Sequence, residues 1–207
     1  MKKITTAFLL LTIMGCASRA PLSEQEKTDE NLRQWTSKVE VFDRRQDRKH
    51  TIEMDFLAMG RERLRIDVNA NFAVVLAAAV VNDGEMTAIL PRDKKYYKGS
   101  ANRAALARSL RMPLDPAWIS ALLRDQELRG DGWSCTRDGG GLLAECTQAA
   151  ESRKVTWSDR SGDFKKVSIS DPRYDFEFRL KEVPTKVQDV NKAFTLNVPP
   201  NYESVKP

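Results

Sequence analysis

Apolar and polar residues alternate along two neighbouring segments of the chain, and a highly charged stretch, residues 43–50, precedes the first. The apolar positions are Ile52, Met54, Phe56 and Ala58 in residues 51–59, and Leu64, Ile66 and Val68 in residues 63–68. A period of two is typical of a strand with one buried and one solvated face. We therefore expect half-buried antiparallel strands here, with a hairpin turn over residues 43–50.

Residues 72–81 are apolar throughout and rich in alanine. Periodicity does not separate a buried helix from a strand in such a run. Because a turn, Asn82-Asp83-Gly84, and another alternating segment follow, we interpret the run as a strand covered on both faces. We expect a short helix over residues 31–35. Further strands are expected at residues 86–90, 96–97, 133–137, 142–148, 154–158, 164–170, 174–181 and 194–198.

Two helices are expected between the two groups of strands. Ser100 is a candidate N-cap for a helix over residues 101–110. Asp115 and Pro116 have the pattern of an N-cap followed by proline at the first helical position, which predicts the start of a second helix. The apolar face of this second helix consists of Trp118, Ile119, Leu122 and Leu123.

About ten strands and two mid-chain helices predict a mainly β (α+β) domain. We expect a single strongly curved antiparallel sheet, a half-barrel, with the helices as a lid over its apolar concave face. Small alanines and adaptable methionines favour an acyl-binding cavity on that face. Its expected lining is Met54, Phe56, Leu64, Ile66, Val68, Leu76, Leu110, Trp118 and Leu122. The alternative is that these residues pack into an ordinary core.

The N-terminus has the form of a bacterial lipoprotein signal. Two lysines precede a short apolar stretch that ends in Ile-Met-Gly-Cys at residues 13–16, which resembles a lipobox. We expect residues 1–15 to be a signal peptide and Cys16 to carry acyl chains such as palmitate, with residues 16–30 as a tether to the domain at 31–207. Ala17 replaces the aspartate typical of inner-membrane retention, which favours the periplasmic face of the outer membrane. The alternative is an ordinary cleaved signal with a chance cysteine.

Composition excludes several classes of protein. The 207 residues are 41% hydrophobic with a net charge of +5, which suits one soluble domain with its own core. The one histidine, His50, lies in the charged turn, and Asp171 and Asp175 are expected on a solvated strand face. Because no GxSxG, HExxH, P-loop or dinucleotide motif occurs, we expect no enzyme, no metal and no cofactor. Export disfavours nucleic-acid binding.

Two cysteines, Cys135 and Cys146, flank a turn-rich stretch at residues 136–141. Export places them in a compartment that permits disulfides. We expect a structural disulfide across a hairpin. A redox pair is the alternative, but it is typical of the spacing Cys-x-x-Cys.

Several short motifs occur in an order that resembles one known family. They are the segment 63–68, the stretch 69–73, the turn 82–84, Tyr96-Tyr97, Met112-Pro113-Leu114 before Trp118-Ile119, and the segment 171–181. Together they resemble the outer-membrane lipoprotein receptor LolB, of the LolA/LolB-like lipoprotein-localisation fold. The resemblance implies a monomeric receptor that accepts acylated lipoproteins from a LolA-like periplasmic carrier and inserts them into the outer membrane.

The resemblance also implies that a projecting loop presents an apolar residue, by position Phe72. Asn71-Phe72-Ala73 replaces the Pro-Leu-Gly-like tip of the family. A buried strand-end residue is the alternative for Phe72. The alternative function is an envelope assembly lipoprotein of the same fold that binds a protein partner.

Overall fold

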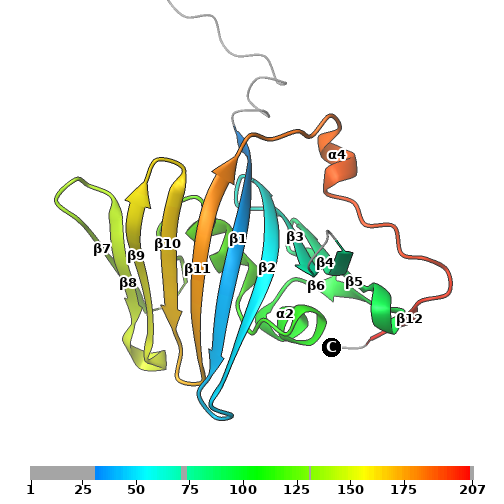
Figure 1. The fold of residues 1–207 in the computed structure, drawn as a ribbon, viewed down its shortest axis with the longest axis horizontal. Helices are drawn as coiled ribbons and strands as arrows, with labels where there is room; N and C mark the ends of the chain where they lie inside the picture. The colour runs from blue at the N-terminus through cyan, green and yellow to red at the C-terminus, as the bar shows by residue number, and fades with distance from the viewer. Residues whose placement is uncertain (1–30, 71–73, 131, 206–207) are drawn as a thin grey trace, which may run out of the picture.

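A computed structural model describes residues 31–70, 74–130 and 132–205, and its main feature is one open sheet of twelve strands (Figure 1). The strands are β1 (Leu32–Asp43), β2 (Arg48–Met59), β3 (Arg63–Ala70), β4 (Val74–Asn82), β5 (Glu85–Leu90), β6 (Lys95–Ser100), β7 (Trp133–Arg137), β8 (Leu143–Gln148), β9 (Arg153–Ser161), β10 (Phe164–Ser170), β11 (Tyr174–Val183) and β12 (Glu203–Ser204). The predicted mainly β class with one large antiparallel sheet is confirmed, with twelve strands in place of about ten.

The first strand holds two meanders together. The strand order is β12-β6-β5-β4-β3-β2-β1-β11-β10-β9-β8-β7, so β1 pairs with β2 on one side and with β11 on the other. All pairings among the described strands are antiparallel except that of β12 with β6. The helices α2 (Arg103–Leu110) and α3 (Pro116–Leu123) connect the meanders. Two 3-10 turns, η1 (Pro91–Asp93) and η2 (Ala149–Glu151), and the short α4 (Val190–Ala193) complete the order.

Three local predictions are wrong. Residues 31–35 are not a helix, because Trp35 pairs with Phe56 and with Glu182 in the centre of the sheet. Residues 194–198 are not a strand, because Phe194 packs against the face of the sheet instead of joining its ladder. The first helix is capped by Asn102, whose side chain accepts the N–H of Ala105 at 2.9 Å. Ser100, the predicted cap, still belongs to β6.

The start predicted for the second helix is confirmed. The carboxylate of Asp115 accepts the N–H of Ala117 at 2.9 Å, and Pro116 is the first helical residue. Proline suits this position because its missing N–H would have no partner there.

One face of the sheet is covered by the helices, and part of the other face is covered by the C-terminal segment. On one face, sheet residues such as Ile66 and Phe178 pack with Leu106 of α2 and Ile119 of α3 in one continuous core. On the other face, the C-terminal segment places Phe194 over a second cluster with Leu32, Leu57 and Val80. Both clusters contain large buried side chains from strands and helices between Leu32 and Val205, so this part of the chain has a core of its own and is expected to fold without residues 1–16.

A disulfide joins the last two strands of the sheet. Cys135 of β7 and Cys146 of β8 are direct partners in the antiparallel register, and the structure links their sulfur atoms. The bond closes a short loop and limits the unfolded chain, which is worth about 2 to 3 kcal/mol for this loop length.

We expect the double variant Cys135→Ser/Cys146→Ser to lose about 2 kcal/mol in the free energy of unfolding. Urea denaturation measures this loss, and the double variant avoids a free thiol. The wild-type protein with reductant should approach the same value. An unchanged free energy in both experiments contradicts a stabilising role for this bond.

Candidate functional site

The β3–β4 hairpin extends beyond its neighbour β5 in the sheet. The ladder between β2 and β3 ends at Glu53 and Asn69, and the ladder between β4 and β5 ends at Ala78 and Ile89. The first residues of β4 therefore pair only with the end of β3. A register shift at Val68 and Asn69 places one extra residue, Leu76, in β4. Such a bulge bends a strand locally.

The projecting end of β4 exposes three large apolar side chains. Val74 is 56% exposed, and Val75 and Leu76 are each 41% exposed. Of the described residues in the run 72–81, which we predicted to be covered on both faces, Ala77 to Val81 are buried and Val74 to Leu76 are not. The exposed part has no neighbouring strand beyond β3. Contiguous exposed apolar side chains are typical of a surface that binds a partner or a membrane.

A groove of about 670 Å³ lies between the hairpin and the C-terminal end of α2. Its apolar lining is Ile52, Val68, Leu76, Ala77, Leu90 and Leu110. Exposed charged residues, Lys38, Glu53 and Arg111, lie at the same groove. Three of the residues predicted to line an acyl cavity, Val68, Leu76 and Leu110, thus come together here. An elongated apolar ligand with a polar end fits such a lining.

The remaining predicted lining residues lie deeper. Met54, Phe56, Leu64, Ile66 and Leu122 are each at most 3% exposed and belong to the core between sheet and helices. Trp118 is partly buried and packs edge-on against Trp133, with 5.2 Å between ring centroids. A ligand reaches these side chains only if α2 and α3 move away from the sheet.

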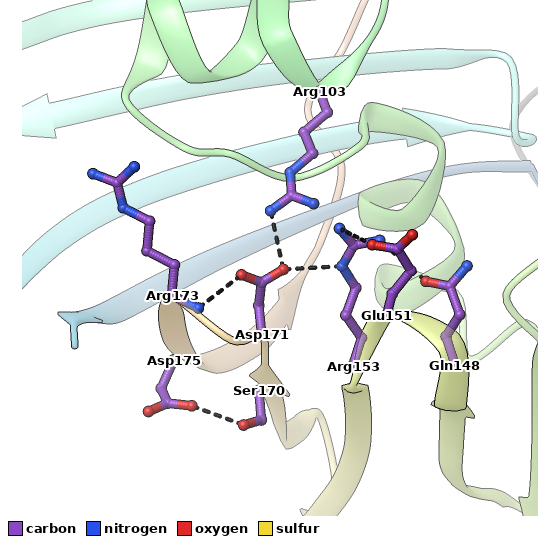
Figure 2. A network of polar contacts seen from close by, with 8 residues as sticks. All are labelled: Arg103, Gln148, Glu151, Arg153, Ser170, Asp171, Arg173 and Asp175. Atoms are coloured by element: carbon purple, nitrogen blue, oxygen red, sulfur yellow. Dashed lines mark hydrogen bonds and ion pairs between the residues drawn. The ribbon is translucent and has the colours of Figure 1, made fainter. Parts of the chain in front are cut away.

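One buried carboxylate bonds α2 to the far half of the sheet (Figure 2). Asp171, 5% exposed, follows β10 and accepts hydrogen bonds from Arg103 at 3.0 Å and from Arg153 at 2.9 Å. Arg103 is the first residue of α2. The guanidinium of Arg153 lies 5.4 Å from the ring centroid of Trp118 in α3. The bonds of Asp171 therefore connect β9, β10, α2 and, through Arg153, α3.

The environment of Asp171 favours its charged form. Burial alone raises the pKa of this carboxyl group. Hydrogen bonds from Arg153 and from the backbone N–H of Arg173, together with the charge of Arg103, outweigh burial and hold the pKa below its usual range. The expectation that Asp171 lies on a solvated strand face is wrong. Asp175, by contrast, forms a partly exposed ion pair with Arg44.

Two predicted site residues, Cys16 and Phe72, lie outside the described residues. In the described ranges, no group of three or more histidine, cysteine or acidic side chains is placed to hold a metal ion. In the same ranges, none of the helices has the length and apolar character needed to cross a bilayer.

Known proteins are similar to this chain in fold. No family model and no curated protein sequence matches it. A DUF1329 family protein from Desulfovibrio piger has a TM-score of 0.51 at 13% identity, over 80% of this chain and 90% of that one. A LolA superfamily protein from Nitrosomonas europaea has a TM-score of 0.48 at 11% identity, over 83% of this chain and 95% of that one. At such identities the likeness concerns the fold alone.

Proposed function

We propose that this protein is an outer-membrane-anchored receptor that takes acylated lipoproteins from a LolA-like periplasmic carrier and inserts their acyl chains into the membrane. One observation carries the proposal: the exposed apolar residues at the start of β4 adjoin an apolar groove. The lipobox-like residues 13–16 are consistent with it.

The proposed mechanism makes and breaks no covalent bond. An acyl chain leaves water for the groove, with a gain of roughly 25 cal/mol for each Å² of apolar surface removed from water. Full uptake needs α2 and α3 to act as a lid that separates from the sheet, against the bonds of Asp171. Direction comes from increasing affinity from carrier to receptor to bilayer.

In this proposal the hairpin is the part that enters the membrane. Phe72 precedes the exposed Val74, Val75 and Leu76, so four large apolar residues would lie within five positions. The transfer of apolar side chains from water to the acyl region of a bilayer is favourable. The acyl chains on Cys16 would keep the domain at the membrane between transfers.

A transfer assay tests the proposal. The acylated receptor on vesicles is mixed with a carrier loaded with acylated lipoprotein, and cargo reaching the vesicles is measured. A control cargo lacks the acyl chains. We expect transfer of the acylated cargo only. Failure to transfer either cargo would refute the receptor function.

A second function has one observation in its favour. Five predicted lining residues are packed into the core, as expected for an assembly lipoprotein that binds a protein partner and no lipid. In that case neither the acylated nor the non-acylated cargo should bind.

A further inference from the structure

Four arginines from different parts of the chain lie close enough for their charges to interact near the start of β1. They are Arg33 of β1, Arg61 between β2 and β3, Arg124 at the end of α3, and Arg129 in the segment that follows. Arg124 Nη1 donates a hydrogen bond to the carbonyl oxygen of Asn31 at 2.7 Å. Arg61 donates to a backbone carbonyl, that of residue 127, at 3.3 Å. We call these four arginines the arginine patch.

The arginine patch holds like charges close together. Burial lowers the pKa of Arg124, and the charges of Arg33 and Arg61 lower it further against the opposing effect of Glu182. Burial and the charge of Arg129 lower the pKa of Arg61 in the same way. The buried Nε of Arg124 has no hydrogen-bond partner among the described residues. An anion at this place would relieve the repulsion.

Nearby carboxylates compensate only part of this charge. Glu182 lies 3.5 Å from Arg33, and both side chains are about half exposed, at 40% and 51%. Exposed pairs of this kind contribute little and exchange readily with other ions. The carboxylate of Glu127 is bound by Arg137 at 2.8 Å, and that of Asp125 by Lys165 at 3.0 Å. Among the described residues, Arg61, Arg124 and Arg129 form no ion pair, so their remaining N–H groups are available to an external anion.

We propose that the arginine patch binds the phosphate groups of anionic phospholipids at the membrane surface. Guanidinium groups match phosphate oxygens in bidentate hydrogen bonds. The place of the patch supports this partner: fourteen residues separate Cys16 from Asn31, a reach of at most about 50 Å. An anchor on Cys16 thus keeps the patch near headgroups. The inference shares this anchoring with the proposed function but does not require lipoprotein transfer.

Headgroup binding at the patch would orient the domain. Arg61 lies just before β3. The exposed residues that begin β4 lie beside the other end of this strand, where Ala70 pairs with Val74. A strand of eight residues spans roughly 25 Å. A domain held by its arginine patch would therefore present the hairpin to a carrier, and it would have to leave this orientation before the hairpin enters the membrane.

The experiment measures co-sedimentation of residues 17–207, without acyl chains, with phosphatidylcholine vesicles that contain or lack phosphatidylglycerol. The test variant Arg33→Gln/Arg129→Gln changes two exposed residues. The control Arg45→Gln/Arg48→Gln removes the same charge from two exposed residues, one in the turn between β1 and β2 and one at the start of β2. We expect salt-sensitive binding to the anionic vesicles, at least tenfold weaker in the test variant and within about twofold of wild type in the control.

Three results would overturn the inference: equal loss in both variants, equal binding to both kinds of vesicle, or release by inorganic phosphate at constant ionic strength. The last would indicate a site for free phosphate. Transfer of acylated cargo by the wild-type receptor is measured separately, so failure of the patch and failure of the receptor function are distinguishable.

Discussion

The variant Leu76→Glu should deliver acylated lipoprotein to vesicles at least about tenfold more slowly than the wild-type protein, with its fold unchanged. Leu76 is 41% exposed at the bulge of the projecting hairpin and also lines the groove. A buried leucine side chain is worth about 1.5 to 3 kcal/mol, and a carboxylate at the bilayer or in the groove adds a desolvation cost. Because the side chain is already exposed, the free energy of unfolding should change by about 0.5 kcal/mol or less.

The sequence offers a matched control for this variant. Leu142, in the turn between β7 and β8, is 50% exposed and lies outside the groove and the hairpin. Leu142→Glu makes the same chemical change and should leave delivery as in the wild type. If both variants deliver at the wild-type rate, or both lose delivery equally, the hairpin is not the transfer surface.

The variant Asp171→Ala should lose about 3 kcal/mol in the free energy of unfolding, the largest stability effect that we expect. The substitution removes the acceptor of Arg103, which is 35% exposed, and one acceptor of Arg153, which keeps its contacts with Glu151 and Gln148. Each hydrogen bond to a charged group contributes about 1.5 to 3 kcal/mol. Urea denaturation measures the loss. Asp175→Ala breaks the more exposed pair with Arg44 and should cost about 1 kcal/mol or less.

The pH dependence of stability tests the same residue. Because the pKa of Asp171 is lowered in the folded protein, its contribution is present above the pKa of the unfolded chain, about 3.9, and is lost as the pH falls through the folded value. Asp171→Asn should therefore flatten part of the loss of stability in acid. An acid limb identical to that of the wild type would show that Asp171 has no lowered pKa.

Local signals in the sequence predict much of the sheet. The strands Trp133–Arg137 and Phe164–Ser170 have the predicted bounds, and the Asp115-Pro116 pattern starts α3 where expected. These segments carry their own period or cap. No such local signal marks residues 31–35 and 194–198, because their conformation depends on partners far away in the chain. Trp35 pairs with Glu182, and Phe194 packs with Val80.

The candidate site is less predictable than the fold. The apolar run from 72 to 81 has one composition throughout, yet its exposure changes at Leu76 because β5 ends before it. That boundary depends on the register of other strands, which no local pattern records. The burial and bonding of Asp171 are equally hard to predict, because its partner Arg103 is 68 positions away along the chain.

Photo-crosslinking from the groove tests the central claim, that the groove accepts an acyl chain. A photoreactive side chain replaces the partly exposed Leu90, which lines the groove, or Ile89, whose side chain points to the opposite face of β5. Each protein is illuminated with carrier-bound cargo that has or lacks acyl chains. We expect cross-links to the acyl chains from position 90 alone, and none with the non-acylated cargo. Equal cross-linking from both positions, or cross-linking that does not require acyl chains, would contradict the account.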